Sequence, residues 1–311
     1  MRIAVFGVGG VGGYFGGRLA QAGEDVVFLA RGEHLRAIRE HGLRVDSING
    51  DFTIQPAQAT DAPASVGAVD AVLVAVKAWQ VPEAAEAMRP LIGPETMVVP
   101  LENGVEAPEQ LAAVLGEAHV LGGLCRIVSF IAGPGHIRHA GIAPYVSFGE
   151  LDNRQSLRVE RLRQAFVQAG AQVEIPPDIQ VALWEKFLFI VAVSSVGAIT
   201  RAPMGVLRSL PETRQMLEQV MRETLAVGRA GGVALDEGYV SGTLAAIDGM
   251  AAGATASMQR DIMEGRPSEL ENQTGTVVRQ GQERGVPTPL SAFLYHSLLP
   301  QERRARGALS F

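Results

Sequence analysis

The first thirty residues contain an apolar run, a cluster of glycines and a second apolar run, Val26–Leu29, in direct succession. The first run, Ile3–Phe6, has the composition of a buried parallel strand. A G-x-G-x-x-G pattern follows it at Gly7, Gly9 and Gly12. In this context the glycines permit a tight turn, close approach of the backbone to a pyrophosphate and close packing of the next helix on the strand. The segment therefore predicts a strand–turn–helix unit that binds a dinucleotide at the helix N-terminus.

The residues around this turn also indicate which dinucleotide binds. Those expected to contact it form the whole turn: Gly7, Val8, Gly9, Gly10, Val11 and Gly12. Enzymes that select NAD usually place an acidic side chain at the end of the second strand, where it binds the ribose 2′-hydroxyl. Here the stretch "FLARGEH" has Arg31 at that place, and a guanidinium suits a 2′-phosphate. The sequence therefore favours NADPH, with an ordinary surface arginine as the alternative interpretation.

Two further apolar runs end in polar residues. Ala71–Val76 leads into Lys77, with Gln80 one turn later, and Val98–Leu101 leads into Asn103. In open α/β sheets, ligands bind outside the carboxyl ends of the strands. We therefore expect Lys77 and Asn103 to lie at the cofactor site, although either residue alone could be a solvated loop residue.

The pattern of elements changes twice along the chain. From Val120, strands alternate with Gly and Pro turns without an intervening helix, which predicts a hairpin or meander. After the "PPD" at 176–178, strand signals disappear and helical patterns continue. We expect an α/β Rossmann-type N-terminal domain, residues 1–176, whose parallel sheet is extended by antiparallel strands, and an all-α C-terminal domain, residues 177–311. The length of 311 residues suits two domains, since single cores stop growing at roughly 250–300 residues.

Charge and apolar patterning exclude several classes of partner. The net charge is −6, and the only basic block is "ERRARG" near the C-terminus, which argues against nucleic acid. The uncharged run Phe187–Ile199 is shorter than the roughly 20 residues that a membrane span needs. Glycines interrupt the apolar N-terminal segment, so it does not match a signal peptide. We expect a cytoplasmic protein with no nucleic-acid or membrane partner.

Cysteine and histidine usage gives no metal motif. The single cysteine, Cys125, excludes an intramolecular disulfide and lies in a stretch typical of a core strand. His136 and His139 stand three apart on a predicted strand, so their side chains should point to opposite faces. No bound metal is expected.

Lys186 lies at the start of the uncharged run Phe187–Ile199. Burying an amine without a partner is unfavourable and lowers its pKa. One interpretation is a lysine prepared to donate a proton, and the other is a long side chain that reaches water from a helix end.

A second group of polar residues follows in "SMQRDIMEGRPSELENQTG". Ser257 and Asp261 are four apart, which places them on one helical face. Ser268 is expected to cap the next helix, with Glu269 in its first turn. An acid at a helix N-terminus is already explained by the helix dipole, so Glu269 has both a structural and a functional interpretation.

Taken in order, these motifs resemble those of the ketopantoate reductase (2-dehydropantoate 2-reductase) family, whose members reduce ketopantoate with NADPH in pantothenate biosynthesis. The matching segments span nearly the whole chain: the glycine turn at 7–12, Arg31, "KAWQ" at 77–80, "ENG" at 102–104, "LWEKF" at 183–187, "SMQRDIMEGRPSE" at 257–269 and "GVPTPLSAFLY" at 285–295.

The resemblance implies roles for individual residues in the second half. Lys186 matches the lysine that acts as general acid, and Glu269 matches the glutamate that orients substrate and cofactor groups. Asn103 matches an asparagine shared by the nicotinamide end and the substrate, and Ser257 a serine near the substrate carboxylate. A lysine pKa brought from about 10.4 towards 7–8 by apolar neighbours such as Ile190 would suit proton donation to the developing alkoxide.

The resemblance also implies the cofactor contacts. A cluster for the 2′-phosphate is formed by Arg31, Lys77 and Gln80. The strand expected to end near Val128 would contact the cofactor through its backbone.

Several positions depart from the family pattern around the substrate. Two asparagines that hold the substrate one and two turns after the lysine are replaced by Ile190 and Ser194, and Met204 replaces a third. The family's "EIDxxNG" reads "ELENQTG", so Glu271 and Thr274 replace Asp and Asn. Ser194 is retained as a candidate substrate contact together with Asn103 and Ser257.

Three functions follow from the sequence. The first is an NADPH-dependent reduction that converts 2-dehydropantoate to pantoate, with Lys186 and Glu269 as the catalytic pair. The second is reduction of a different branched 2-oxo acid, favoured by Ile190 and the altered "ELENQTG". The third is a non-catalytic NADPH sensor with the same fold, which retention of Lys186 and Glu269 disfavours. A small 2-oxo acid is the expected partner, and a homodimer is a possible assembly.

Overall fold

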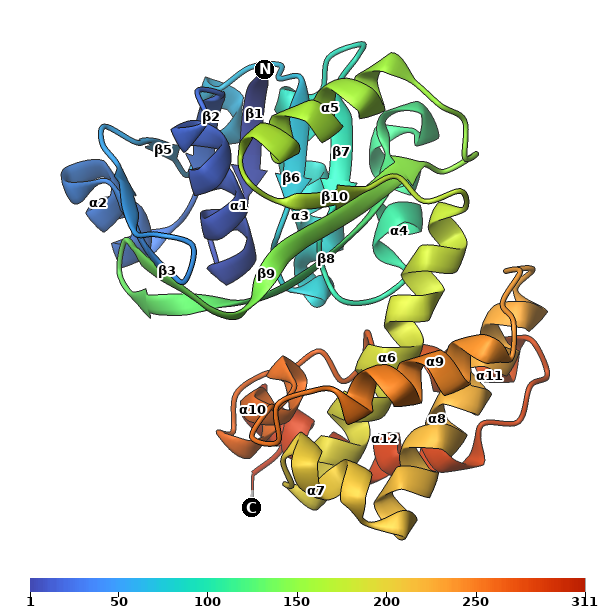
Figure 1. Ribbon diagram of the computed structural model, residues 1–311. Coiled ribbons are helices and arrows are strands. Elements are labelled where there is room, and N and C mark those ends of the chain that lie inside the picture. Colours follow the sequence, from blue (N-terminus) through green and yellow to red (C-terminus); the bar gives the residue numbers. More distant parts are fainter. Residues whose placement is uncertain (311) are drawn as a thin grey trace. The chain divides into compact units, whose positions relative to one another are not determined.

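The computed structural model describes residues 1–310, which form two compact units (Figure 1). The first unit consists of Met1–Glu102 and Glu106–Ile179, and the second of Asn103–Val105 and the chain from Gln180 onward. All the described strands belong to the first unit, and the described elements of the second are helices. The predicted combination of an α/β part and an all-α part is confirmed.

The first unit contains a parallel sheet in the order β5-β2-β1-β6-β7 (Figure 1). Its strands are β1 (Arg2–Phe6), β2 (Asp25–Leu29), β5 (Gln58–Thr60), β6 (Ala71–Val74) and β7 (Met97–Pro100). The helices that accompany these strands are α1 (Gly10–Gln21), α2 (Gly32–His41), α3 (Val81–Ala87) and α4 (Ala107–Leu115). The strand–helix alternation is that of a Rossmann-type fold.

Both faces of the parallel sheet are buried. Successive side chains of a strand point to opposite faces, so Ile3 and Val5 enter one core, where Phe15 of α1 also packs. Ala4 and Phe6 enter a different core, with residues of α3 and α4. Because both faces are covered, strands such as β6 consist of uninterrupted apolar residues.

A second sheet in the first unit has the order β10-β9-β3-β4, with β8 paired to β9. Its strands are β3 (Leu43–Ser47), β4 (Phe52–Ile54), β8 (Leu121–Gly133), β9 (His136–Glu150) and β10 (Gln172–Glu174), and α5 (Leu157–Gln168) precedes β10. β8 and β9 are the predicted antiparallel hairpin, and a parallel bridge from Val98 to Val120 connects it to the first sheet. β3 was not expected, because its parallel pairing with β9 is a long-range contact that local sequence does not encode.

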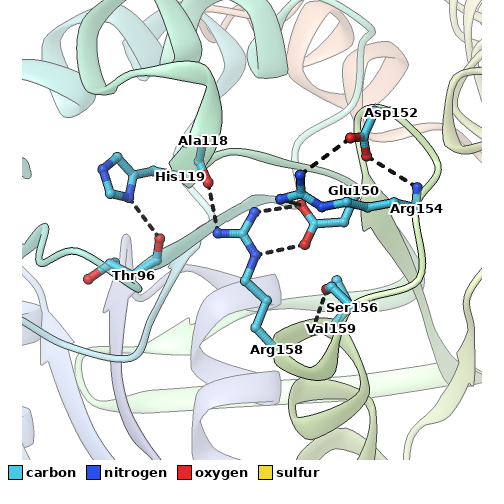
Figure 2. Close-up of polar contacts among 9 residues, drawn as sticks. All are labelled: Thr96, Ala118, His119, Glu150, Asp152, Arg154, Ser156, Arg158 and Val159. Carbon is cyan, nitrogen blue, oxygen red and sulfur yellow. Dashed lines mark hydrogen bonds and ion pairs between the residues drawn. The ribbon is translucent and has the colours of Figure 1, made fainter.

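The end of β9 is fixed to α5 by a buried ion pair, shown in Figure 2. The Arg158 side chain donates from Nε to Oε1 of Glu150 at 2.7 Å and from Nη2 to Oε2 at 2.5 Å. Its third nitrogen, Nη1, donates to the Ala118 carbonyl oxygen at 2.7 Å. The side chains of Glu150 and Arg158 are only 3% and 16% exposed, so the pair is largely shielded from water.

Glu150→Gln is expected to lower the free energy of unfolding by about 3 kcal/mol at neutral pH, the usual cost of breaking a buried ion pair. Burial, the largest single influence, would raise the pKa of the Glu150 carboxyl, but the hydrogen bonds from Arg158 and Ser156 and the charges of Arg158 and Arg154 together hold that pKa below its ordinary value. The stabilisation is therefore complete above the unfolded carboxyl's pKa of about 4.3 and disappears as the pH falls through the folded value.

Urea unfolding of wild type and Glu150→Gln from pH 7 down to about pH 3 measures the difference in their free energies of unfolding. The same series shows whether this difference decreases in acid. Arg163→Gln, which removes an exposed ion pair with Glu160 within α5, serves as the control and should change stability by less than about 1 kcal/mol. A difference between wild type and Glu150→Gln that does not vary with pH would contradict the ion-pair explanation.

The second unit is built from α6 (Ile179–Thr200), α7 (Met204–Ser209), α8 (Pro211–Ala230), α9 (Gly238–Asp248), α10 (Ser257–Met263), α11 (Thr274–Glu283) and α12 (Pro289–Ala305). Its main core is formed by residues of α6, α7, α8, α9, α11 and α12. A smaller core is formed by Ala198 of α6, Met258 and Ile262 of α10, and Leu298 of α12, together with Leu270 from the segment between α10 and α11.

By length and composition alone, α6 is apolar enough to cross a membrane. However, 67% of its most apolar window is buried inside the protein. This burial is typical of a core helix, and it explains why α6 is apolar on all sides instead of having one polar face.

Candidate active site

The glycine turn after β1 is shaped by close backbone contacts. Gly7 has a φ of +99°, and a Cβ added at Gly12 would lie 2.1 Å from the Gly7 carbonyl oxygen. A Cβ added at Gly10 would lie 2.2 Å from the carbonyl oxygen of Ser129 in β8. At Gly9 an added Cβ would have no atom within 4 Å. The turn is thus closed where it packs against the protein and open at Gly9.

The start of α1 has the features of an anion site. Gly9 is the N-cap, no side chain caps the helix, and no acidic residue lies in the first turn. The first backbone N–H groups of a helix have no intrahelical acceptor, and the helix dipole attracts negative charge there. Val8 is buried and Val11 half-buried, so the open groups of the turn are backbone groups. These residues fit the pyrophosphate of a dinucleotide.

The three residues expected at a 2′-phosphate lie in neighbouring segments of the first unit. Arg31 is the N-cap of α2, and its Nη2 is 3.7 Å from Oε1 of Glu83 in the first turn of α3. Lys77 is the N-cap and Gln80 the last residue of the short helix η2 (Ala78–Gln80) directly before α3, and the Lys77 N–H donates to Gln80 Oε1 at 3.2 Å. Arg31 therefore lies near α3, the helix that directly follows the segment with the other two residues.

The expectation that a strand ends near Val128 is wrong. β8 continues to Gly133, because the ladder with β9 resumes at Val128 after a register shift and extends to His136. Val128 itself is 41% exposed. The next residue, Ser129, contacts the glycine turn at Gly10, so the strand passes beside the turn although it does not end there.

In the second unit, the structure brings Asn103 and Glu269 together. Asn103 Nδ2 is 3.4 Å from Oε2 of Glu269, and Gln273 Nε2 donates to the same oxygen at 3.1 Å. Glu269 is 4% exposed and Gln273 is fully buried. A buried carboxylate is unfavourable unless it is hydrogen-bonded, and here two amides from different segments supply donors.

Glu269 does not lie in a helix, in contrast to the prediction. α11 begins only at Thr274, and Glu269 belongs to the turn before it. Ser268 was expected to be the N-cap, but its N–H and hydroxyl donate to the buried carboxylate of Glu302. Its Oγ still accepts from the Leu270 N–H at 3.3 Å, as an N-cap would, but no helix starts at Glu269. The explanation of Glu269 through the dipole of its own helix therefore no longer applies.

Lys186 lies within α6 and not at its end. The helix begins at Ile179, two turns earlier, and Lys186 is half-buried. Ile190 and Ser194 follow at i+4 and i+8, on the same face of the helix. Ile190 is half-buried, and Ser194 is fully buried with an Oγ that has no hydrogen-bond partner in the described residues.

The remaining candidate substrate residues differ in their surroundings. Ser257 is the first residue of α10 and is half-buried. Gln259, in the same helix, lies beside α6, since a Cβ added at Gly197 would be 2.6 Å from its Oε1. Met204 is 2% exposed within the main helical core, so this side chain packs the unit. Thr274 is fully buried, and its Oγ1 has no hydrogen-bond partner among the described residues.

The two histidines considered as metal ligands bind other polar groups. His136 Nε2 is 2.8 Å from Oδ2 of Asp46, and His139 contacts Ser47 and the Ile142 carbonyl oxygen. Cys125 is buried. Within residues 1–310, no group of three or more His, Cys, Asp or Glu side chains could hold a metal ion.

The sequence did not identify Gln273 or Glu83 as site residues. Gln273 lies four residues after Glu269, a spacing that allows contact in any helical turn, so this signal was available. Glu83 meets Arg31 across 52 positions of sequence, and no local pattern indicates that contact.

The sequence and fold were compared with known proteins. The family model "Ketopantoate reductase PanE/ApbA" matches residues 3–153, and its C-terminal counterpart matches residues 178–302. The uncharacterized oxidoreductase YkpB of Bacillus subtilis is 30% identical over 96% of this chain and 98% of its own length. The 2-dehydropantoate 2-reductase structure from Geobacter metallireducens has a TM-score of 0.90 at 34% identity, covering 97% of this chain and 99% of that one.

A further structure, of D-mandelate dehydrogenase with NADH and anilino(oxo)acetate, shares the fold. Its TM-score is 0.90 at 22% identity, and the match covers 98% of this chain and 99% of that one. Since the two family models together span most of the chain, this protein belongs to the ketopantoate reductase family, and it is an oxidoreductase that acts on CH–OH groups with a nicotinamide cofactor.

Proposed function

We propose that this enzyme uses NADPH to reduce a small 2-oxo acid to the 2-hydroxy acid, with 2-dehydropantoate as the first candidate substrate. The observation that carries the proposal is the buried Glu269 carboxylate, bound by the amides of Asn103 and Gln273 in the unit that also contains Lys186. Retention of both Lys186 and Glu269 disfavours a protein that only senses NADPH. The proposed setting is pantothenate biosynthesis in the cytoplasm, and light scattering tests whether the enzyme is a homodimer.

When bound, NADPH supplies the hydride that attacks the carbonyl carbon of the 2-oxo acid. Reduction places negative charge on the carbonyl oxygen, and we assign Lys186 Nζ as the group that stabilises and protonates it. Glu269 is assigned to orient the reacting groups, with Asn103 and Gln273 holding its Oε2. Ser257 and Ser194 are the proposed polar contacts of the substrate.

The glycine turn and the Arg31 region support the choice of cofactor. The uncapped start of α1 and the open space at Gly9 accommodate a pyrophosphate. Arg31 lies near α3, directly after the segment of Lys77 and Gln80, and its guanidinium would pair with a 2′-phosphate there.

A branched 2-oxo acid without a hydroxyl group is the second candidate substrate. Ile190 favours it, because this half-buried apolar side chain lies on the same face of α6 as Lys186. A site without a hydrogen-bonding partner gains little from a substrate hydroxyl, whereas a site built to bind that hydroxyl discriminates strongly.

NADPH oxidation across a panel of branched 2-oxo acids, 2-dehydropantoate included, tests the assignment. We expect 2-dehydropantoate to have a catalytic efficiency, kcat/KM, at best comparable with that measured for a plain branched 2-oxo acid. Ile190→Asn should shift the ratio towards 2-dehydropantoate, since the amide restores a partner for the hydroxyl. A wild-type preference for 2-dehydropantoate of about 10⁴-fold or more would contradict this view of the substrate site.

A further inference from the structure

The residue before Glu269 is held by the last turn of α12. Ser268 is fully buried, and its N–H donates to Glu302 Oε1 and Oε2 at 3.1 and 3.0 Å. Its hydroxyl donates to Glu302 Oε2 at 2.5 Å. Arg306 Nη2 donates to the Ser268 carbonyl oxygen at 2.9 Å. Both backbone polar groups and the side chain of Ser268 therefore bind residues more than thirty positions away.

Glu302 and Arg306 also bind each other, which closes the network. Arg306 Nε donates to Glu302 Oε1 at 2.5 Å, and the side chains of Glu302 and Arg306 are 2% and 33% exposed. A buried carboxylate needs a charge partner and several hydrogen bonds to be tolerated, and this one has both. The network is a cyclic set of charge-assisted hydrogen bonds, which are shorter and stronger than neutral ones.

The other side of Glu269 is fixed as well. The N–H groups of Asn272 and Gln273 donate to the Glu269 carbonyl oxygen at 3.1 and 2.9 Å. Leu270 is fully buried in the small core with Ala198 and Leu298. The direction in which the Glu269 side chain leaves the backbone is therefore set by Ser268 before it and by this turn after it.

We propose that Glu302 and Arg306 are positioning residues of the reductase: through Ser268 they hold the Glu269 carboxylate in its catalytic orientation. This inference rests on the proposed function. Because Glu302 is buried and bound to Ser268 and Arg306, it acts on the reaction through Ser268 and does not contact the substrate. A displacement of about 1 Å in a reacting group can cost about 10²-fold in rate, so loss of the network should be visible in kcat.

The chain offers a matched control at the other end of α12, where Glu223 of α8 binds Ser291. Glu223 is 7% exposed and accepts from the Ser291 N–H at 2.8 Å and from the Ser291 hydroxyl at 2.6 Å. This repeats the contacts of Glu302 with Ser268, but Ser291 lies in the first turn of α12. Eleven residues of helix, about 16 Å, separate it from Glu302.

The test compares Glu302→Gln with Glu223→Gln in the full-length protein. We expect both variants to lower the urea midpoint, but only Glu302→Gln to lower kcat, by about 10- to 100-fold. NADPH affinity should stay within about twofold in both. Arg306→Lys retains the charge but cannot bind Ser268 and Glu302 in the same geometry, so its kcat should lie between the values for wild type and Glu302→Gln.

A double-mutant cycle shows whether the effect passes through Glu269. If it does, adding Glu302→Gln to Glu269→Gln should lower kcat by less than about twofold. Equal losses of kcat in Glu302→Gln and Glu223→Gln, or an undiminished effect in the Glu269→Gln background, would overturn the positioning role. An active wild type with a fully active Glu302→Gln overturns this inference alone, whereas an inactive wild type overturns the proposed function.

Discussion

Lys186→Ala is expected to lower kcat for 2-oxo acid reduction by about 10²–10⁴, the range for a positioned proton donor. The affinity for NADPH should change by less than about twofold, because the residues proposed to bind the cofactor phosphates belong to the other unit. Steady-state kinetics together with a fluorescence titration of NADPH separate the two quantities.

Lys186→Gln is the sharper form of this test. Glutamine keeps a hydrogen-bond donor of similar reach but has no proton to give at neutral pH, so the variant should stay impaired. The wild-type rate should fall at high pH, where the amine has lost its proton, and the variant should lack this fall. Near-normal turnover in Lys186→Ala would mean that the lysine has only a structural role in α6.

Arg31→Ala is expected to weaken NADPH binding by about 1.5–3 kcal/mol, the contribution of a charged hydrogen bond, and to leave NADH binding nearly unchanged. The selectivity arises because only NADPH carries the 2′-phosphate. Titrating wild type and Arg31→Ala with NADPH and with NADH measures this selectivity. Equal weakening for the two cofactors would contradict the placement of the 2′-phosphate at Arg31.

Glu83→Gln is a control for the Arg31 experiment, because it should change NADPH binding in the opposite direction to Arg31→Ala. The Glu83 carboxylate is 3.7 Å from Arg31, and both side chains are about 70% exposed, so the pair itself adds little stability. A 2′-phosphate bound to Arg31 would lie near this negative charge. Removing the charge should tighten NADPH binding about two- to fivefold without tightening NADH binding.

The part of the cofactor region that depends on local sequence could be predicted. Gly7, Gly9 and Gly12 directly follow a buried strand, and this order is enough to specify the turn. The contact of Gly10 with Ser129 could not be predicted, since it depends on the long hairpin of β8 and β9. The same hairpin continues past Val128 because of pairing along its whole length, which a local strand signal does not measure.

The helical unit shows where local rules were insufficient. Ser268 satisfies the rule for an N-cap, yet Glu302, 34 residues later, binds its N–H and hydroxyl, and α11 begins six residues further on. Here tertiary packing determines the partner of the side chain, and the spacing of residues in the sequence carries no information about that packing.

The most direct test of the central claim is the stoichiometry of the reaction catalysed by the purified wild-type protein. NADPH consumed and 2-hydroxy acid formed should be measured together, with 2-dehydropantoate and with a plain branched 2-oxo acid. The proposed function predicts one 2-hydroxy acid for each NADPH oxidised with at least one of these substrates. Saturable NADPH binding with no oxidation by any 2-oxo acid would contradict it and would favour a cofactor-sensing protein.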